Sequence, residues 1–240
     1  ALHLLLSNSV NKITLNDGDY HIYAFWNSLL NDTEQFLKKI HHCTISINAW
    51  KRHRDVYLFP EKYTELEVGF STFFLNRCNR SGILTKAGPI GGIEQNGNYL
   101  IDARFNKISL KKRIEAIAIH SSKISIFNLD TLAFLKSHKI VFSTELSLIY
   151  LDPPYYRKGS SLYLNHYNHN DHVNISEELN SMRNCKWIVT YDNVPEIDKI
   201  YNSFRKTIFF LNYSLQKTRK ASEIMILSDN INIPSSLNTK

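Results

Sequence analysis

The chain has 240 residues, 43% of them hydrophobic, so it is long enough for one large α/β domain with a well-buried core. No apolar stretch is long enough to span a membrane, and the opening segment Ala1–Leu6 is too short for a signal sequence, so a cytoplasmic location is expected. Three widely spaced cysteines argue against a disulfide framework or a cysteine metal cluster, and the net charge of +7 suits a polyanionic partner without proving one.

Two acidic residues follow the first predicted strand. Leu2–Leu6 is expected to end a helix, and Lys12–Asn16 to form a short strand that stops at Asp17. At the end of the second strand of a doubly wound sheet, a carboxylate is placed to bind both hydroxyls of a ribose, which makes Asp17 a cofactor candidate. Alternatively, Asp17 or Asp19 caps a helix from about Tyr20 to Leu30, and the spacing favours neither interpretation.

The next segments are predicted to be helices followed by a loop-rich insertion. Asp32 is expected to cap a helix through about Ile45, and Pro60 to open another that packs its aromatic residues in the core. Those residues are Tyr63, Phe70, Phe73 and Phe74. From Asn76 to Asn106 the composition changes, because six of the eight glycines fall between Gly69 and Gly97. This composition suits loops and not a sheet core, so residues 51–106 are predicted to be a helical, loop-rich recognition insertion.

The remaining elements alternate between helices and strands. Helices are predicted at Ser109–His120, from Thr131, at Ser176–Arg183 and from Pro195, and strands at Lys123–Phe127, Leu148–Leu151, Trp187–Tyr191, Thr207–Asn212 and Glu223–Leu227. Such alternation predicts a doubly wound, mostly parallel α/β sheet in which the last two strands form an antiparallel C-terminal hairpin. Residues 1–50 and 107–234 are assigned to this sheet domain, and residues 235–240 to a tail.

The strand Leu148–Leu151 is followed by four residues with distinctive chemistry. Proline cannot donate to a ladder, so Asp152-Pro153-Pro154-Tyr155 ends the strand, at the place where open α/β sheets bind ligands. Asp152 and the Pro153 carbonyl can accept both hydrogens of an amino group on an aromatic ring, and Tyr155 offers a stacking face. Two such acceptors draw the nitrogen lone pair out of conjugation, which makes that nitrogen a nucleophile. The alternative is a strand and a rigid turn in which Tyr155 only packs.

Basic residues gather in several parts of the chain. Some of these clusters contain aromatic residues or lie in predicted loops, which is typical of a phosphate-contacting surface and not of one solvated helix face. The clusters are Lys51–Arg54, Arg77 with Arg80, Arg104–Arg113 and Lys217–Lys220. Arg77, Arg80 and Arg104 can each read guanine or hold a phosphate, and the sequence does not separate these roles.

Taken in order, these segments resemble the Dam-type DNA adenine methylases, which transfer a methyl group from S-adenosylmethionine to the exocyclic amino group of adenine. The resemblance covers nearly the whole chain. Asp152, Pro153, Pro154 and Tyr155 match the family's catalytic motif without substitution. The resemblance implies that the cofactor is bound by Asp17, Asn128, Leu129, Asp130 and Asp152. Phe74–Gly82 resembles the family's Asn-Arg recognition segment, and the residues expected to bind double-stranded DNA are Asn76, Arg77, Arg80, Arg104, Lys107, Lys217 and Arg219.

One element of the family's pattern, a Gly-rich cofactor loop before the first core helix, is missing, because the chain begins in what would be that helix. We expect the protein to continue upstream, since a sheet without its first strand would expose the edge of its neighbour. The resemblance implies that the target adenine is flipped out of the duplex and attacks the sulfonium methyl in line, without a metal. His166, His169 and His172 fit no helical ligand pair, and a loop with Tyr163, Asn165 and Tyr167 is expected to close over the base.

Two rival functions stay open at this point. The same motif serves amino methylation of other planar groups, which keeps an RNA amino-methyltransferase in consideration. A catalytically silent, nucleic-acid-binding methyltransferase subunit is the second rival. The intact motif and the ribose-type acid argue against silence, and the basic, Gly-rich insertion favours duplex DNA. A cognate restriction enzyme could accompany the activity, and neither the target sequence nor the oligomeric state follows from the sequence.

Overall fold

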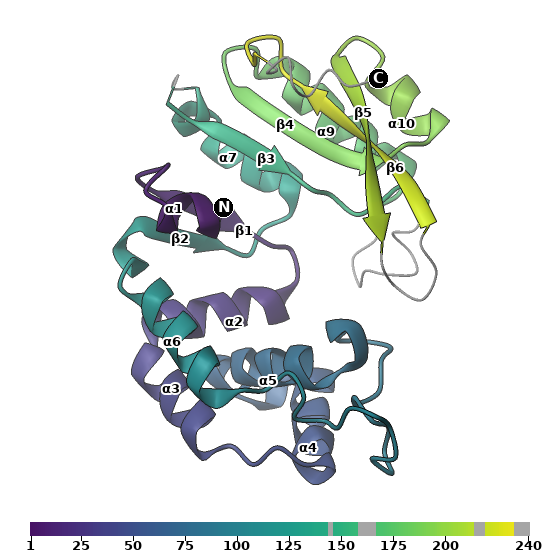
Figure 1. Cartoon of the computed structure of the whole chain (residues 1–240). Coiled ribbons are helices and arrows are strands. Elements are labelled where there is room, and N and C mark those ends of the chain that lie inside the picture. The colour runs from purple at the N-terminus through teal and green to yellow at the C-terminus, as the bar shows by residue number, and fades with distance from the viewer. Residues whose placement is uncertain (144–145, 158–166, 214–218, 233–240) are drawn as a thin grey trace. The chain divides into compact units, whose positions relative to one another are not determined.

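The structure is a computed structural model that describes residues 1–143, 146–157, 167–213 and 219–232 (Figure 1). The contacts divide the chain into two compact units, Ala1–Leu129 and Asp130–Lys240. Each unit has its own hydrophobic core and its own sheet. Within the described residues, no helix is both long and apolar enough to cross a membrane.

The first unit is mainly helical, with one small parallel sheet. Its strands β1 (Ile13–Asn16) and β2 (Ile124–Phe127) pair in parallel, which puts Asn16 opposite Phe127 at their carboxyl ends. The helices are α1 (Leu2–Leu6), α2 (Tyr20–Asn31), α3 (Thr33–His42), α4 (Ile47–Leu58), α5 (Glu65–Cys78) and α6 (Lys107–Ala118), with short 3₁₀ turns η1 (Pro60–Lys62), η2 (Arg80–Gly82) and η3 (Ser121–Lys123).

Helix α5 is central to the core of the first unit, because it packs against both α2 and α4. Its aromatic residues Phe70, Phe73 and Phe74 are buried, which confirms the prediction that they belong to the core. Gly69 lies where α2 and α5 come close together. A Cβ atom at this position would lie 2.3 Å from the carbonyl oxygen of Ala24, so only glycine fits there.

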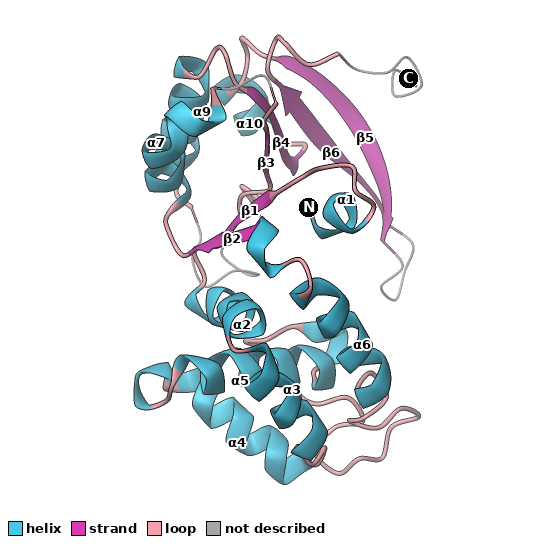
Figure 2. Ribbon diagram, turned by 90° about the vertical axis from the view of Figure 1, so that its left-hand side faces the viewer, coloured by secondary structure: helices cyan, strands magenta, loops and turns pink. Residues whose placement is uncertain are grey.

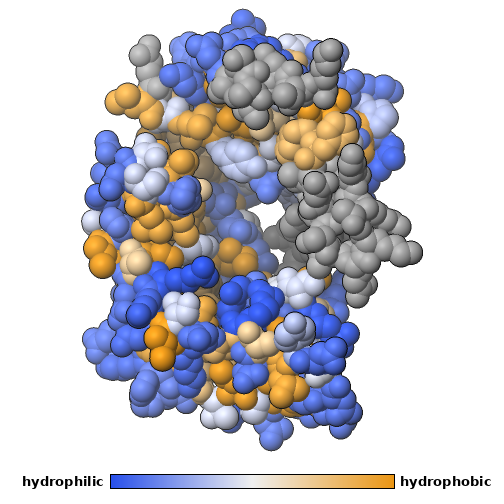
Figure 3. Space-filling model, viewed as in Figure 1, coloured by the Kyte–Doolittle hydropathy of each residue, from blue (hydrophilic) through white to orange (hydrophobic). Residues whose placement is uncertain are grey.

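The second unit is a mixed sheet with helices on one face (Figure 2). The strand order is β3-β4-β6-β5, in which β3 (Leu148–Leu151) is parallel to β4 (Lys186–Asp192), and β6 (Arg219–Leu227) is antiparallel to β4 and to β5 (Arg205–Tyr213). The helices α7 (Thr131–Phe142), α9 (His169–Ser181) and α10 (Pro195–Ile200) share a core with the sheet. Leu148 and Tyr150 point to the other face and are 57% and 60% exposed, and other hydrophobic side chains also reach the surface (Figure 3).

Two helix starts differ from the prediction for reasons of capping. Pro60 opens only η1, and the aromatic helix α5 begins at Glu65, where Thr64 and Glu67 form a capping box. The helix predicted at Ser176–Arg183 begins earlier, at His169, because Asn168 caps it in a second capping box. The helix after Asp32 ends at His42, before the predicted Ile45.

Helix α4 was not among the predicted helices, and it carries the basic cluster Lys51–Arg54. Ser46 starts this helix by accepting a hydrogen bond from the N–H of Ala49. Within the cluster His53 is half-buried against Phe74, and Arg54 donates to the carbonyls of Leu84 and Thr85. Only Lys51 and Arg52 of this cluster are exposed.

The α/β class and the antiparallel C-terminal hairpin are confirmed. The single doubly wound, mostly parallel sheet is not, because the described strands form a two-stranded parallel sheet and a four-stranded mixed sheet. The predicted domain boundary at residue 50 falls inside α4. Residues 51–106 supply α5 to the core that also holds α2 and α3.

We predict that Gly69→Ala destabilises the protein by about 1–3 kcal/mol, because the new methyl group overlaps the backbone of α2 and the helices must move apart. Thermal or urea unfolding of the variant measures this loss. Gly88→Ala is the matched control, since the nearest atom to a Cβ there is Arg80 Nη2 at 3.8 Å. Equal stability of the two variants would contradict the close approach of α2 and α5.

Candidate active site

The motif Asp152–Tyr155 lies directly after β3, as predicted. Ile149 and Leu151 of β3 are buried in the core, so the strand is held firmly up to its last residue. The register places Leu151 of β3 beside Val189 of β4. The residues that follow these two in the sequence are Asp152 and Thr190. The parallel pairing therefore brings a polar side chain of β4 to the acid of the motif.

A chain of hydroxyl groups holds the Asp152 carboxylate. The Thr190 hydroxyl donates to Asp152 Oδ1 at 3.1 Å, and the Tyr150 hydroxyl lies 2.9 Å from the Thr190 oxygen. Since Thr190 has one hydroxyl hydrogen and gives it to Asp152, Tyr150 is the donor to Thr190. Asp152 is exposed, yet partial burial of its carboxyl raises the pKa of this group. The Thr190 hydrogen bond lowers that pKa, and the nearby charge of Glu223 raises it.

The aromatic residue of the motif is anchored to the antiparallel part of the sheet. The Tyr155 hydroxyl donates to Glu223 Oε1 at 2.6 Å, and Glu223 lies on β6 with only 6% of its surface exposed. This short contact has the geometry of a charge-assisted hydrogen bond. It fixes the far end of the Tyr155 side chain.

The two residues after the motif are held through their backbone. Asp192, at the end of β4, accepts the N–H of Tyr156 at 2.8 Å and the N–H of Arg157 at 3.2 Å. The Tyr156 hydroxyl also lies 2.9 Å from His169 Nδ1. Thr190, Asp192 and Glu223 were not assigned roles from the sequence. The polar strand end Thr190–Asn193 was a visible signal for the first two, whereas nothing local marked Glu223.

In the first unit, Asp19 and not Asp17 is the residue that caps α2. Asp19 caps α2 by accepting the N–H of His21 at 2.8 Å, and it also contacts His21 Nδ1 at 2.9 Å. Asp17 does not cap the helix, and its Oδ1 accepts the N–H of Asp19 at 2.9 Å. Asp17 is half-buried at the end of β1, and this burial raises the pKa of its carboxyl. A carboxylate therefore stands at the carboxyl end of a parallel strand.

The ends of β1 and β2 are tied together by asparagine side chains. The Asn128 amide donates to the Asp17 carbonyl at 2.7 Å. Asn16, for which the sequence predicted no role, donates to the Leu129 carbonyl at 3.0 Å and accepts the Leu129 N–H at 3.1 Å. These bonds bring Asn128 and Leu129 beside Asp17. Asp130 begins the second unit, where its Oδ1 caps α7 by accepting the N–H groups of Leu132 and Ala133.

The predicted DNA-recognition residues lie in a segment held by side chain–backbone hydrogen bonds. Asn76 and Arg77 are in the last turn of α5, where the Asn76 amide donates to the Gly82 carbonyl at 3.1 Å and its oxygen accepts from Arg77 Nη2 at 2.7 Å. Arg80 is exposed in η2, and its Nε donates to the Pro89 carbonyl at 3.4 Å. Burial, together with the positive charges of Arg104 and Arg113, lowers the pKa of Arg77.

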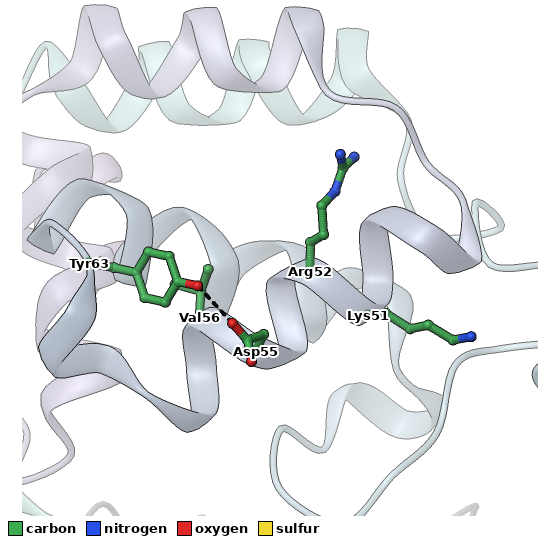
Figure 4. A pocket seen from close by; sticks show the side chains of 5 residues that line it. All are labelled: Lys51, Arg52, Asp55, Val56 and Tyr63. Atoms are coloured by element: carbon green, nitrogen blue, oxygen red, sulfur yellow. Dashed lines mark hydrogen bonds between the residues drawn. The ribbon is translucent and has the colours of Figure 1, made fainter.

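The other predicted DNA contacts differ in their surroundings. Arg104 is exposed, but the Lys107 ammonium donates to the carbonyls of His41 and Cys43 at 2.9 and 2.6 Å, which gives it a role at the end of α3. Lys217 lies outside the described residues, and Arg219 pairs with Tyr213 where β5 and β6 meet the connecting segment. A shallow hollow beside α4 and η1 is lined by Lys51, Arg52, Asp55, Val56 and Tyr63, and it holds no residue of the catalytic motif (Figure 4).

The expected lid and the histidines are only partly described. Tyr163, Asn165 and His166 lie outside the described residues, whereas the Tyr167 hydroxyl donates to Thr131 Oγ1 at 2.8 Å. His172 is buried, and its Nδ1 lies 3.1 Å from the Tyr191 hydroxyl. In the ranges that the structure covers, no three His, Cys, Asp or Glu residues are grouped so that they could hold a metal ion.

Comparison with known proteins agrees with the geometry of the motif. No curated protein matches the chain. The family model for D12 class N6 adenine-specific DNA methyltransferases matches residues 1–218, which include both strand ends, the recognition segment and Asp152–Tyr155. Because this match covers most of the 240 residues, the chain belongs to the D12 class N6 adenine-specific DNA methyltransferase family.

Proposed function

We propose that this chain methylates the N6 amino group of an adenine that has been flipped out of duplex DNA, with S-adenosylmethionine as the methyl donor. Family membership makes it an adenine-specific DNA methyltransferase, and the hydrogen bond from Thr190 to Asp152 at the end of β3 is the observation that supports the catalytic assignment most directly. The doubly wound sheet expected of the family is part of this proposal, and the parallel pairs β1–β2 and β3–β4 support it.

Asp152 is proposed to orient the target amino group. Thr190 occupies Asp152 Oδ1 from one side, which fixes the carboxylate plane and leaves the group able to accept a hydrogen from an –NH2 group. The Pro153 carbonyl is proposed to accept the second hydrogen. When bound, S-adenosylmethionine supplies an electrophilic methyl group on a sulfonium sulfur. The negative charge of Asp152 stabilises the positive charge that develops on the adenine nitrogen, because it lies in a partly desolvated site.

Tyr155 is proposed to stack on the flipped base, with Pro154 keeping the turn rigid. Flipping costs a few kcal/mol because the base leaves its stacking and pairing partners. A ring whose orientation is already fixed recovers part of this cost without losing further side-chain entropy. The hydrogen bond from Tyr155 to Glu223 supports such a role.

Asp17 is proposed to bind the ribose hydroxyls of the cofactor. Asp17 is a half-buried carboxylate at the end of β1, and its backbone carbonyl is held by Asn128. Its two oxygens can accept the hydrogen bonds that two neighbouring hydroxyl groups donate. Asn128 and Leu129 are proposed to lie along the cofactor's adenine. Asp130 is also proposed to contribute to cofactor binding, in addition to capping α7.

Duplex DNA is the proposed macromolecular substrate, and the net charge of +7 supports contact with its phosphates. The proposed DNA contacts of the recognition segment are Asn76, Arg77, Arg80 and Arg104. The proposed domain organisation stays a recognition insertion at residues 51–106 and a catalytic domain formed by residues 1–50 and 107–234. Lys107, Lys217 and Arg219 are secondary candidates. We propose that the enzyme acts in the cytoplasm, on DNA that a cognate restriction enzyme also recognises.

The test of this function compares transfer of a labelled methyl group to duplex DNA with transfer to structured RNA of equal length. It separates a DNA methyltransferase from an RNA methyltransferase and from a catalytically silent nucleic-acid-binding subunit.

We predict that Asp152→Ala reduces methyl transfer by at least about 100-fold, because the variant loses the acceptor and the charge that act in the transition state. Affinity for S-adenosylmethionine should stay within about tenfold, since most cofactor contacts are elsewhere. The assay is labelled methyl transfer to duplex DNA, with Glu177→Ala, an exposed carboxylate on α9, as control. Turnover of Asp152→Ala near that of the control would refute the assignment.

The Thr190 hydrogen bond stabilises the ionised form of Asp152 and so lowers its pKa, against the larger effect of burial. Thr190→Val removes this bond, so the pKa of Asp152 rises further and a smaller fraction is ionised at acidic pH. We predict that the acid limb of the kcat–pH profile moves to higher pH. Thr207→Val on β5 is the control for the substitution itself. An acid limb that does not move would mean that a group other than Asp152 controls it.

Asp17→Ala should weaken S-adenosylmethionine binding by about 1.5–3 kcal/mol, the usual value of hydrogen bonds to a charged group. Calorimetry on the isolated variant measures the change. Asp19→Ala is the informative control, because Asp19 caps α2 and its loss should cost about 0.5–2 kcal/mol of stability while leaving cofactor affinity nearly unchanged. If the two variants exchanged these effects, the ribose role would belong to Asp19.

A further inference from the structure

Glu223 and Asp192 form an unfavourable pair in the second sheet. They lie directly opposite each other on the antiparallel strands β6 and β4, and Phe209 of β5 is the neighbour of Glu223 on its other side. Like charges at directly opposed positions destabilise a sheet, and burial of Glu223 adds a desolvation cost. An apolar or hydroxyl side chain at position 223 would make the sheet more stable. The contacts of the Glu223 carboxylate therefore indicate a role other than sheet stability.

Both acids are used by the loop that follows β3. Asp192 accepts the backbone N–H groups of Tyr156 and Arg157, while Glu223 accepts the hydroxyl of Tyr155. Three consecutive residues are therefore held by carboxylates from two neighbouring strands. Because the side chains of Asp192 and Thr190 lie on the same face of β4, the hydroxyl that holds Asp152 belongs to the same group of anchors.

We propose that Glu223 is a positioning residue, which aims the aromatic ring of Tyr155 at the flipped adenine through the Tyr155 hydroxyl. This inference rests on the proposed function. A tyrosine side chain attached only at its Cα can rotate about two bonds, and a fixed hydroxyl at the far end removes that freedom before the base arrives. Glu223 contributes to the reaction by keeping the ring in place, and it need not touch the adenine itself.

The position of the ring has a measurable consequence for the chemical step. Stacking determines where the amino group lies relative to Asp152 and the Pro153 carbonyl, and a displacement of about 1 Å can cost on the order of 100-fold in rate. Loss of the anchor should therefore lower kcat more than it raises KM for DNA. A residue needed only for folding would lower the amount of active enzyme and leave no such dependence on Tyr155.

The test is a double-mutant cycle between Glu223→Leu and Tyr155→Phe, with Glu223→Gln as the conservative variant that keeps an acceptor. We expect Glu223→Leu and Tyr155→Phe each to lower kcat by about 10–100-fold, and the double variant to be no slower than the slower single variant. Glu223→Gln should recover most of the rate, because its amide oxygen still accepts from Tyr155. Independent, multiplicative losses, or an unchanged kcat in Glu223→Leu, would overturn the proposal. If Glu223→Leu does not fold, Tyr155→Phe decides alone, because it removes only the hydroxyl that Glu223 holds, and an unchanged kcat in that variant overturns the proposal.

A second measurement reads the ring directly. After methylation of mixed duplex DNA has located the target adenine, that base is replaced by 2-aminopurine, whose fluorescence is quenched when it stacks. With the Glu223→Leu variant at a saturating concentration, we expect the flipped 2-aminopurine to fluoresce more strongly than it does with the wild-type enzyme. Equal quenching of its fluorescence by the two proteins would count against the proposal. Asp152→Ala, assayed in parallel, distinguishes a failure of the proposed function from a failure of the positioning role of Glu223. If that variant stays active, the proposed function itself fails, whereas loss of its activity with an additive cycle rejects only the role of Glu223.

Discussion

The parallel pairing of β3 with β4 is the interaction on which the geometry of the Asp152–Tyr155 motif depends. Its register sets Leu151 beside Val189, so the first residues beyond the buried pair, Asp152 and Thr190, meet at the end of the sheet. A slip of one residue would turn Thr190 to the helix-covered face and leave the acid of the motif without its donor. The buried side chains of both strands, Ile149, Leu151, Trp187 and Val189, exclude that slip because they fill the core. Core packing thus sets the geometry of an exposed carboxylate.

The antiparallel strand β6 adds what a parallel pair alone would lack. It brings Glu223, which is 71 residues beyond Asp152 in the chain, to the ring of Tyr155. The directly opposed acids Asp192 and Glu223 are unfavourable for the stability of this end of the sheet. They also hold the loop after β3 at successive residues through hydrogen bonds. Local conflicts with sheet stability are expected at functional sites, since a position optimised for binding need not be optimal for packing.

In the first unit a smaller parallel pair uses neutral side chains for the same purpose. Asn16 closes both backbone groups of Leu129, and Asn128 holds the carbonyl of Asp17. Asn16 and Asn128 therefore fix two strand ends without adding charge near the Asp17 carboxylate. The raised pKa of Asp17 reflects its burial in this setting, partly offset by the N–H of Asp19. The capping of α2 by Asp19 leaves Asp17 available for another role.

The sequence by itself determined the elements whose signals are local. The apolar run ending at Asp152-Pro153-Pro154-Tyr155, the aromatic spacing of α5 and the alternation of helices and strands were sufficient for the α/β class, the motif and the family. Capping decided what periodicity could not, as at Thr64, Ser46 and Asn168, where a side chain–backbone bond sets the first residue of a helix. Only the tertiary structure decided the partners of the motif, Thr190, Asp192 and Glu223, and that Asp19 caps α2 and Asp17 does not. Those contacts depend on strand register and on hydrogen bonds between residues that are far apart in the chain or compete for the same donor. The local sequence can mark a polar strand end, but it does not show which residues meet there.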